Sequence, residues 1–470
     1  MKRRLRVYKK TVSIVNETAI GMYESLVGNK KGFLLESYDK NYDRYTFFGK
    51  EPEEIITSRG DALVIRQNNG TEEIRKGNPL ERLKEYYSEF DIVKENEELS
   101  FSGGLVGNLG YDFVRYAEVL PDNNPDEIGI ETIQMMLMTK FILVDHVAET
   151  LTAVILGEDS EDGKKKALAE AAELIEEARK NAGQIPDRNF THDGVIVSQS
   201  DTLEQYCEKV EKIKQYIREG HIFQTVLSQR WTIETKQTGF ELYKELRELN
   251  PSPYLYYFNY GDFEVIGSSP EMIVKQQGSR GYTCPIAGTR RRGVDAEEDA
   301  LLRDELLRDE KERAEHVMLV DLARNDMGRI SEFGTVKVTQ FMEVQNYSHV
   351  MHIVSMVEGK KKGEFHPLDL VSSFLPAGTL SGASKIRAME IIDELESVRR
   401  GLYGGATGYI DFSGDMDFCI TIRTMIKKKN RVYLQAGAGI VADSVPENEY
   451  QECCNKVMAL AKTLIEEENL

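Results

Sequence analysis

The sequence has few of the residues and segments on which several classes of protein depend. It contains one Trp, 12 Pro and five Cys among 470 residues. The cysteines lie at positions 207, 284, 419, 453 and 454 without Cys-x-x-Cys spacing, which indicates neither a disulfide framework nor a zinc site. No apolar run approaches the roughly 20 residues that span a bilayer, and none follows the basic start of the chain. We therefore expect a soluble, cytoplasmic protein.

A basic surface is also missing. The formal net charge is −19, and no part of the chain forms a broad basic field. This excludes a general nucleic-acid binder, because such proteins neutralise the phosphate backbone with clustered Lys and Arg. The 41% of hydrophobic residues is enough to build one large or two ordinary folded domains.

The hydrophobic pattern divides the chain into two parts. Short strand-like runs dominate residues 11–156, a helical pattern lies near 80–90, and an amphipathic helix is predicted at 162–181. The polar segment 183–200 has no sustained period. We therefore place a linker there, between an N-terminal domain at 11–182 and a second domain at 201–466.

The second part mixes helices with consecutive strands. We expect a helix from 202 to 218, a strand at 224–234, and a strand meander between 402 and 441 that includes one continuous strand at 418–426. Consecutive strands without intervening helices indicate an α+β fold with large antiparallel sheets and flanking helices.

Residues 311–326 form the most distinctive helical segment. From 317 to 323 the run is apolar apart from Asp321, which predicts a helix buried on almost every side. At its start Glu312 and Glu315, three residues apart, place two carboxylates on one helical face. Taken alone, this pair also fits a solvated helix entrance favoured by the helix dipole.

A second carboxylate pair occurs near the C-terminus. Ser444 and Glu447 have the spacing of a capping box, Pro446 falls in the first turn, and Glu449 and Glu452 are again three residues apart. The two helices together offer four carboxylates.

Four carboxylates suit a hard cation. The chain has no compact Asp-rich calcium loop, which favours Mg²⁺ held by few carboxylates and water. Lys456, four residues after Glu452, places a cation near the same space. An ordinary ion pair between Lys456 and Glu452 is the alternative interpretation.

Two glycine-rich segments offer main-chain N–H groups to an anion. One directly follows a predicted strand, at 436–439, and the other, at 376–382, precedes a helical stretch at 385–395. Such segments also mark ordinary turns. Arg423 has apolar neighbours in a predicted strand, which is typical of a bidentate carboxylate clamp, so we expect a dicarboxylate ligand.

Two residues are candidates for proton transfer. His352 lies in an apolar, β-prone run where most histidines are core residues, but imidazole titrates near neutral pH, which makes it the candidate general base. Glu271 follows a tight turn at 267–270 and is a candidate general acid if it is buried and protonated.

Nine motifs in one order resemble those of the chorismate-utilising enzymes, and most closely the family of anthranilate synthase large subunits. They span nearly the whole chain and are FQTVLSQR (223–230), GSSPE (267–271), PIAGTR (285–290), ERAEHVMLVDLARND (312–326), HVMHIVS (349–355), AGTLSGASK (377–385), CITIRT (419–424), QAGAGIV (435–441) and ENEYQEC (447–453). The resemblance implies a β-sandwich-like fold of two interlocked subdomains.

The resemblance implies a lyase that aminates chorismate and eliminates pyruvate to give anthranilate. It implies Mg²⁺ as cofactor, bound by Glu312, Glu315, Glu449 and Glu452. It assigns catalytic roles to His352, Glu271, Thr379 and Gln224, and substrate binding to Arg423, Tyr403, Lys456, Gly437, Ala438, Gly439, Ala287, Gly288 and Thr289.

Two positions separate the members of this family. Water-adding relatives carry a lysine base where this chain has Gln224, which cannot deprotonate water, whereas ammonia needs no such base. Many aminodeoxychorismate synthases carry a lysine in place of Ala287. Both positions favour anthranilate formation. The alternatives are an aminodeoxychorismate synthase, an enzyme that stops at aminodeoxyisochorismate, and a non-catalytic tryptophan-binding protein.

The resemblance also implies feedback inhibition by tryptophan. The motif LLES (34–37) resembles the inhibition motif of the family, although an ordinary strand and turn would look the same. The implied inhibitor site comprises Leu35, Glu36, Ser37, Arg44, Asn250, Pro251, Tyr254, Leu255 and Cys419.

The chain itself has no recognisable source of ammonia. No cysteine lies in a Gly-x-Cys-x-Gly nucleophile turn, so the resemblance implies a separate glutamine amidotransferase subunit and a hetero-oligomer.

One loop departs from the pattern of the family. Arg291 stands where the family usually has proline, so this loop lacks one fixed φ angle.

Overall fold

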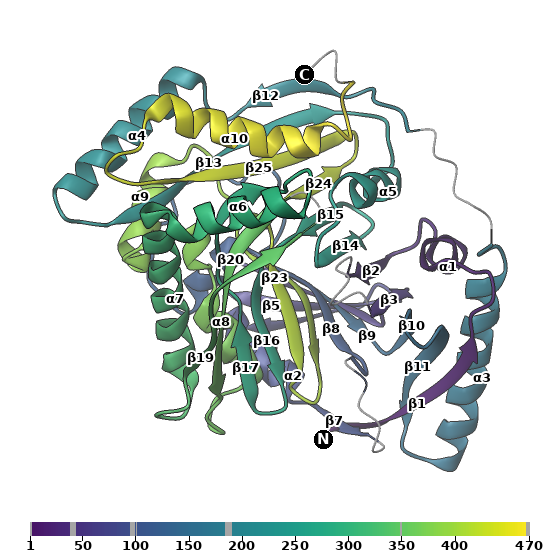
Figure 1. Ribbon diagram of the computed structural model, residues 1–470. Coiled ribbons are helices and arrows are strands. Elements are labelled where there is room, and N and C mark those ends of the chain that lie inside the picture. The colour runs from purple at the N-terminus through teal and green to yellow at the C-terminus, as the bar shows by residue number, and fades with distance from the viewer. Residues whose placement is uncertain are drawn as a thin grey trace.

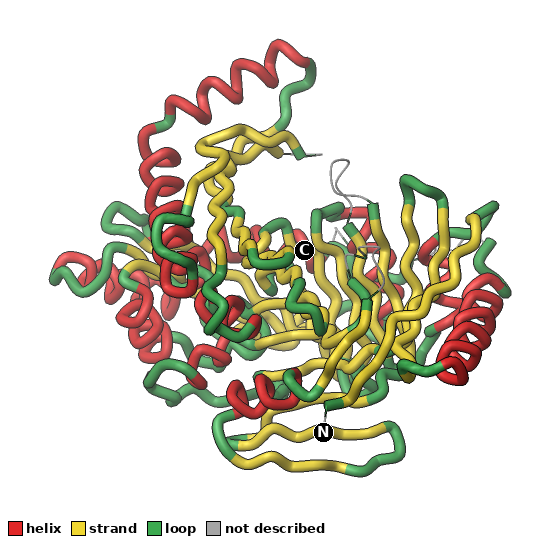
Figure 2. The backbone as a smooth tube through the Cα atoms, turned by 90° about the horizontal axis from the view of Figure 1, so that it is seen from below, coloured by secondary structure: helices red, strands yellow, loops and turns green. Residues whose placement is uncertain are grey.

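Two large β-sheets form the centre of the protein, with helices around them (Figures 1 and 2). The computed structural model describes residues 2–37, 44–94, 99, 101–183, 190–347 and 350–466. The strand pairs within the sheets are antiparallel, apart from β1 with β7. The predicted α+β fold with large antiparallel sheets and flanking helices is therefore confirmed.

The first sheet has 13 strands and draws them from both ends of the chain. In spatial order they are β12 (Val195–Gln199), β13 (Gln224–Glu234), β25 (Arg431–Ile440), β24 (Thr424–Lys428), β15 (Glu264–Ser269), β14 (Tyr254–Asn259), β2 (Gly32–Glu36), β3 (Tyr45–Lys50), β10 (Lys140–Asp145), β11 (Thr150–Glu158), β1 (Arg3–Ser13) and β7 (Phe90–Val93), with β21 (Gly382–Ala383) paired to β13.

The second sheet has 12 strands and also draws them from both parts of the chain. Its order is β18 (Ile286–Arg291), β20 (Val350–Lys360), β17 (Arg280–Thr283), β16 (Met272–Gln277), β23 (Met416–Ile420), β22 (Ala406–Asp411), β8 (Gly104–Leu109), β9 (Ile133–Met138), β4 (Glu54–Arg59), β5 (Ala62–Gln67) and β6 (Glu72–Lys76), with β19 (Lys337–Asn346) paired to β20.

The helices lie on the outside of the sheets. In Figure 1, α4 and α10 lie along β13 and β25, α7 and α8 lie beside β16 to β20, and α3 covers β1 and β11. The bounds are α1 (Ala19–Leu26), α2 (Pro79–Tyr87), α3 (Glu161–Arg179), α4 (Leu203–Arg218), α5 (Gly239–Leu249), α6 (Ala296–Arg308), α7 (Glu310–Ile330), α8 (Pro367–Phe374), α9 (Lys385–Leu395) and α10 (Pro446–Ala461), with 3₁₀ helices η1 (Tyr111–Tyr116) and η2 (Gly378–Leu380). No helix among the described residues has the length and apolar character that crossing a membrane requires.

Several predicted elements are confirmed because local signals define them. The predicted helix at 202–218 is α4, whose capping box joins Thr202 to Gln205. The predicted strand at 224–234 is β13, and the predicted helices near 80–90 and at 162–181 are α2 and α3. The strands expected in the first part of the chain appear as β2, β5, β8 and β10.

The two parts of the chain share both sheets. Leu255 of β14 pairs with Glu36 of β2 in the first sheet, and Gly408 of β22 pairs with Gly107 of β8 in the second. The segment at 183–200 includes β12, which pairs with β13 at the edge of the first sheet. The division into domains at 11–182 and 201–466 stays a prediction. In each sheet the strands of the first part form one contiguous block, which pairs edge to edge with a block of strands from the second part.

The prediction of one strand at 418–426 is wrong. The chain leaves β23 in the second sheet at Ile420 and enters β24 in the first sheet at Thr424. Arg423 lies in this crossover with φ of +48°, a conformation that non-glycine residues adopt rarely. The apolar pattern continues through the break because both strands are buried, so hydrophobicity alone could not locate it.

The helix at 311–326 exists as part of α7, but the prediction that it is buried on almost every side is wrong. Its buried residues follow a helical period along one face: His316, Leu319, Val320, Ala323, Asp326, Met327 and Ile330. Val317, on the other face, is 40% exposed. The apolar composition of the segment therefore overstates its burial.

The C-terminal carboxylate helix begins differently from the prediction. α10 starts at Pro446, as expected, but its N-cap is Val445 and no side chain caps it. Ser444 instead accepts a hydrogen bond from the Val441 N–H through Oγ at 3.1 Å. The predicted capping box between Ser444 and Glu447 is therefore wrong, because the hydroxyl is used by the preceding turn.

Candidate active site

Glu271 is placed by the turn between β15 and β16. Its carbonyl accepts the Ile420 N–H at 2.9 Å, and its Oε1 accepts the Thr379 hydroxyl of η2 at 3.3 Å. Burial raises the pKa of Glu271 to about 8, against the opposing effects of the Thr379 hydrogen bond and the Arg423 charge. Glu271 is therefore protonated at neutral pH and can donate a proton.

His352 lies on β20 with its ring orientation set by β18. A register shift between Ala287 and Thr289 leaves Gly288 with φ of +72°, and the Gly288 carbonyl accepts from His352 Nδ1 at 2.9 Å. Thr289 Oγ1 lies 3.1 Å from the same nitrogen. A carbonyl only accepts, so Nδ1 carries the proton and Nε2 has the lone pair.

The charge state of His352 also suits a base. Burial lowers its pKa, the Gly288 hydrogen bond acts in the opposite direction, and the positive charge of Arg423 lowers the pKa further. The imidazole is therefore neutral near pH 7. The ring of Tyr347 packs edge-on at 5.3 Å between centroids.

The positive charge of Arg423 acts on both Glu271 and His352 and lowers the pKa of each. Its side chain is exposed to solvent, yet the surrounding protein lowers the pKa of its guanidinium, and Glu271 opposes this effect. Both observations fit a residue on the wall of a solvent-filled site, where its planar donors can bind a carboxylate.

The glycine segment predicted after a strand lies inside β25, so that part of the prediction is wrong. Gly437 is opposite Ser228 of β13, whose N–H donates to Glu396 rather than to β25. The main-chain groups of Gly437 therefore point away from β13. β24 pairs with β25 only as far as Leu434, so no described strand covers the outer edge at Gly437 and Gly439.

Two predicted site residues lie against these glycines. A Cβ atom at Gly437 would come within 3.0 Å of the Tyr403 hydroxyl, and one at Gly439 within 2.7 Å of Gln224 Nε2. Glycine is therefore required for this close approach. Ala438, between the two, is fully buried. Tyr403, Gln224 and the free N–H edge of β25 thus share one space.

The glycine segment at 376–382 does not offer its main-chain amides to a ligand. The N–H groups of Leu380 and Ser381 donate to the Ala377 carbonyl at 3.0 and 3.1 Å, which forms the turn of η2. These amides are engaged within the segment. Its contribution is to place Thr379, whose hydroxyl binds Glu271.

Lys456 makes the ion pair that the sequence left as an alternative. Its Nζ lies 2.7 Å from Glu452 Oε1 and also donates to the Gly437 carbonyl at 2.9 Å. The ammonium group therefore connects the carboxylates of α10 to the glycine edge of β25.

Glu312 and Glu315, the first two predicted metal ligands, lie on α7, and Glu449 and Glu452 lie on α10. Burial and the neighbouring Glu312 and Glu452 carboxylates raise the pKa of Glu315. Burial and Glu452 raise the pKa of Glu449, against a hydrogen bond from Ser444. The carboxylates therefore repel one another across the two helices.

This donor set fits a hard divalent cation, because a cation would relieve the repulsion between carboxylates. Within the described residues, no three His, Cys, Asp or Glu side chains lie close enough together to hold a metal. Arg290 also lies 3.6 Å from Glu312 Oε1 and Lys456 engages Glu452. The four carboxylates suit Mg²⁺, and in the structure the side chains of Arg290 and Lys456 neutralise part of their negative charge.

Hydrogen bonds, ion pairs and electrostatic effects link the predicted site residues in two groups. In the first, Lys456 joins Glu452 to Gly437, Glu452 acts on the pKa of Glu315, and a Cβ atom at Gly288 would lie 3.2 Å from Glu312 Oε2. In the second, Thr379 donates to Glu271, and the charge of Arg423 acts on the pKa values of Glu271 and His352. Gly288, whose carbonyl binds His352, links the second group to Glu312 of the first.

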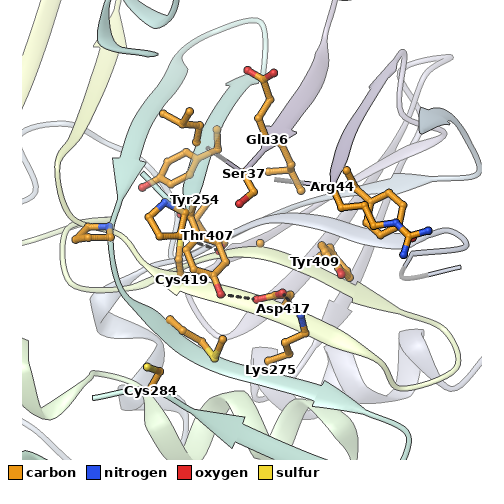
Figure 3. Close-up of a pocket in the computed structure, with 18 of the residues that line it drawn as sticks. Glu36, Ser37, Arg44, Tyr254, Lys275, Cys284, Thr407, Tyr409, Asp417 and Cys419 are labelled. Atoms are coloured by element: carbon orange, nitrogen blue, oxygen red, sulfur yellow. Dashed lines mark hydrogen bonds and ion pairs between the residues drawn. The ribbon is translucent and has the colours of Figure 1, made fainter. Parts of the chain in front are cut away.

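A second site is a cavity of about 370 Å³ between the two sheets (Figure 3). Seven of the residues predicted for an inhibitor line it: Leu35, Glu36, Ser37, Arg44, Tyr254, Leu255 and Cys419. Asn250 and Pro251 are not among its lining residues, and Asn250 Nδ2 donates to the Ala459 carbonyl at 3.2 Å.

The cavity combines an apolar wall with charged groups. Tyr254 donates to Asp417 at 2.9 Å, and Lys275 Nζ lies 3.2 Å from the same carboxylate. Figure 3 shows the side chains of Tyr254 and Lys275 on either side of Asp417. The buried Ser37 Oγ has no hydrogen-bond partner among the described residues. A zwitterionic ligand with an apolar ring has complementary chemistry.

Sequence reasoning missed several residues of this cavity. Thr407, Lys275, Asp417 and Cys284 line it but belong to no predicted inhibitor motif. Thr407 could be found only from its pairing with Cys419 across β22 and β23. Strand register is a tertiary property, and no local signal marked it.

Comparisons with known proteins agree with this geometry. Residues 33–462 match the family model described as chorismate binding enzyme. "Anthranilate synthase component 1" of Acetivibrio thermocellus is 45% identical over 96% of this chain and 93% of its own length, and the Thermus thermophilus protein of that name is 42% identical over 98% of both.

Solved structures give the same result for the fold. The structure of anthranilate synthase component I from Streptococcus pneumoniae matches with a TM-score of 0.77 at 38% identity, covering 89% of this chain and 92% of the other. The menaquinone-specific isochorismate synthase of Escherichia coli has a TM-score of 0.73 at 18% identity, covering 98% of this chain and 94% of the other. This second likeness bears on the fold alone.

Proposed function

Since the chain belongs to the chorismate binding enzyme family, we propose that it converts chorismate and ammonia to anthranilate and pyruvate, the first committed step of tryptophan biosynthesis. The family resemblance drawn from the nine motifs is confirmed. The observation that carries the proposal is the buried, protonated Glu271, which accepts a hydrogen bond from Thr379 and lies within the electrostatic influence of Arg423, as His352 does.

The residues that separate members of the family support amination. Gln224 packs against Gly439 and has no basic atom that could accept a proton from water, and Ala287 has no nucleophilic group. Gln224, at the position where water-adding relatives carry a lysine base, therefore cannot activate water. Ammonia, which is already a nucleophile, is the co-substrate that this site accepts.

The first chemical step uses Glu271. Arg423 and the N–H groups of Gly437 and Gly439 bind the two carboxylates of chorismate, and Tyr403 orients the ring. Ammonia forms a bond to C2, the C4–O bond breaks, and Glu271 gives its proton to the departing hydroxyl to form water. The product of this step is aminodeoxyisochorismate.

The second step uses His352. Its Nε2 accepts the proton from C2 while the bond to the enolpyruvyl oxygen breaks, so that pyruvate leaves and the ring becomes aromatic. Mg²⁺, which Glu312, Glu315, Glu449 and Glu452 would hold, would supply a positive charge for the ring carboxylate. Arg423, Tyr403 and the N–H groups of Gly437 and Gly439 hold the substrate in both steps.

Incubation of the purified chain with chorismate, Mg²⁺ and ammonium tests this function. We expect the fluorescence of anthranilate and an equal amount of pyruvate. Formation of aminodeoxychorismate instead would identify the folate-branch activity, and aminodeoxyisochorismate without pyruvate would identify an enzyme that stops after amination. Chorismate binding without any turnover would contradict an enzymatic role.

The His352→Met variant tests the elimination step. We expect anthranilate formation to fall by about 100-fold while aminodeoxyisochorismate accumulates, because Met offers no basic nitrogen. Chromatography of the reaction mixture measures both products, and the exposed His221→Met variant is the control. Normal anthranilate output without accumulated intermediate would remove His352 from this step.

Ammonia reaches this enzyme from a separate glutamine amidotransferase subunit. We place both in the cytoplasm, where the five thiols of this chain, free in the structure, stay reduced. We expect the chain alone to form anthranilate with ammonium but not with glutamine, and addition of the partner subunit to supply glutamine-dependent activity. Full activity of this chain alone with glutamine would contradict a separate partner.

Tryptophan is the inhibitor that fits the cavity in Figure 3. Its indole would contact the apolar wall, and its charged groups would meet Asp417, Lys275 and the Ser37 hydroxyl, which has no partner among the described residues. The cavity reaches Cys419 on β23, four residues before Arg423. Binding there can therefore act on the crossover that carries Arg423.

The Ser37→Phe variant tests this site. The larger ring fills the cavity, so we expect the tryptophan concentration for half inhibition to rise at least about tenfold, while anthranilate is still formed without tryptophan. Initial rates at subsaturating chorismate measure the change, with Ser88→Phe at an exposed position as control. Equal inhibition of the variant and the wild type would place tryptophan elsewhere.

A further inference from the structure

Beneath the active site lies a buried ion pair that no motif of the sequence identified. Arg400 and Glu396 are 2% and 5% exposed, and Arg400 NH2 lies 2.6 Å from Glu396 Oε1. Arg400 Nε also donates to Glu396 Oε2 at 2.9 Å, so the contact is bidentate. A charged pair this far from solvent carries a large desolvation cost, so its further contacts are informative.

The remaining donors of Arg400 reach two segments of the active site. NH1 donates to the Leu380 carbonyl at 2.6 Å, next to Thr379, and NH2 donates to the Val226 carbonyl at 2.8 Å, on the strand that begins with Gln224. Four hydrogen bonds thus use most of the five N–H donors of the guanidinium.

The guanidinium also contacts a third segment. Arg400 Cζ lies 5.6 Å from the ring centre of Tyr403, and the Tyr403 N–H donates to the Arg400 carbonyl at 3.2 Å. The Tyr403 hydroxyl in turn lies against Gly437. The same side chain thus supports Thr379, the strand of Gln224, and Tyr403.

Glu396 extends this arrangement to the strand that faces Gly437. Its Oε1 accepts the Ser228 N–H at 2.9 Å and the Ser228 hydroxyl at 2.7 Å. Ser228 is the residue opposite Gly437, in a pair whose main-chain N–H and C=O groups point away from each other. By binding the N–H and the hydroxyl of Ser228, Glu396 anchors the stretch of β13 that faces Gly437.

We propose that the Arg400–Glu396 pair is the positioning device of this active site. It touches no reacting atom and acts through Thr379 on the acid Glu271, and through Tyr403 and Ser228 on the carboxylate-binding edge at Gly437. This inference rests on the proposed function. Lysine cannot replace Arg400, because an ammonium group lacks the planar fork that reaches two carbonyls and a carboxylate together.

Three variants test the proposal: Arg400→Lys, Arg400→Met, and the double variant Glu396→Gln with Arg400→Met. The single Met variant leaves Glu396 charged without a partner, so it lowers the melting temperature. The double variant removes both charges and keeps an amide oxygen for Ser228, so it recovers much of that stability. We expect kcat/KM for chorismate to stay at least about 100-fold below wild type in all three, because displacement of positioned groups is costly to catalysis.

The pH dependence of kcat/KM is a second measurement, and a loss of stability alone would not change it. The Thr379 hydroxyl lowers the pKa of Glu271, so loosening of η2 raises that pKa. The basic limb of kcat/KM should then move to higher pH by roughly half a unit in the folded variants. Arg75, which pairs with Glu89 and packs over the Tyr86 ring away from the site, gives the matched control Arg75→Met, with unchanged kinetics.

The outcomes separate this proposal from the proposed function. Chorismate and ammonium are first tested with the wild type, and absence of anthranilate there counts against the function, whatever the variants do. If the wild type is active, a folded Arg400 variant with wild-type kcat/KM and an unmoved pH limb overturns the proposal. Failure of all three variants to fold, while Arg75→Met folds, also overturns it, because the pair would then serve folding.

Discussion

Replacement of Glu271 by Gln is expected to lower kcat with ammonium by about two to four orders of magnitude, the range that general acid catalysis contributes. Glutamine keeps the size of the side chain and can still accept the Thr379 hydroxyl, but it has no acidic proton for the departing C4 hydroxyl. Steady-state anthranilate fluorescence measures the loss. Retention of more than a tenth of the wild-type kcat would exclude Glu271 as the acid.

The pH dependence of the wild type should identify the same group. Activity requires protonated Glu271, so kcat/KM should fall above pH about 8, the pKa to which burial raises this carboxyl. The residual activity of Glu271→Gln should lack this limb. Thr379→Val is the informative control, because it keeps the acid but removes a hydrogen bond that lowers its pKa, so its limb should move to higher pH.

Stability should change with pH in a related way. The folded pKa of Glu271 lies above the ordinary value of 4.5, so the stability linked to its proton is fully present below that value and is lost as the pH rises to about 8. Glu271→Gln lacks this loss. The melting temperature of the variant relative to wild type should therefore increase between these pH values, and an unchanged difference would contradict the raised pKa.

Replacement of Glu315 by Gln should reduce Mg²⁺-dependent activity at least about 100-fold, because it removes one charge from the carboxylate cluster that would hold the metal. The fold should remain intact. Burial and the repulsion from Glu312 and Glu452 raise the pKa of Glu315, so the neutral variant should melt at a higher temperature than wild type without metal. Mg²⁺ should raise the melting temperature less in the variant than in wild type.

A residue on the same helix provides the control for this experiment. Glu310 is exposed in the first turn of α7, so Glu310→Gln changes the charge of the helix entrance without touching the cluster. It should leave the Mg²⁺ dependence unchanged. A Glu315→Gln enzyme with wild-type activity and wild-type Mg²⁺ titration would overturn the metal assignment, and calorimetric Mg²⁺ binding gives a second measurement independent of turnover.

Much of the local structure and the chemistry of the site could be predicted from the sequence. Capping residues and periodic apolar positions located α4 and β13, because these signals act over neighbouring residues. The motifs also named the proposed acid Glu271 and its neighbours Thr379 and Arg423, which the structure places within hydrogen-bonding or electrostatic reach of one another. The burial of α7 was overestimated, since composition does not specify which face a helix turns to its neighbours.

What the sequence by itself determined is the set of chemical groups: a carboxyl and an imidazole suited to proton transfer, four glutamates suited to a cation, and glycines where other groups approach the main chain closely. Only the tertiary structure decided the crossover at Arg423, the partner of Lys456, and the pair of Arg400 with Glu396. It also decided the raised pKa of Glu271. The physical reason is that strand register, desolvation and buried ion pairs depend on residues far apart in the chain, which come into contact only when both sheets are assembled.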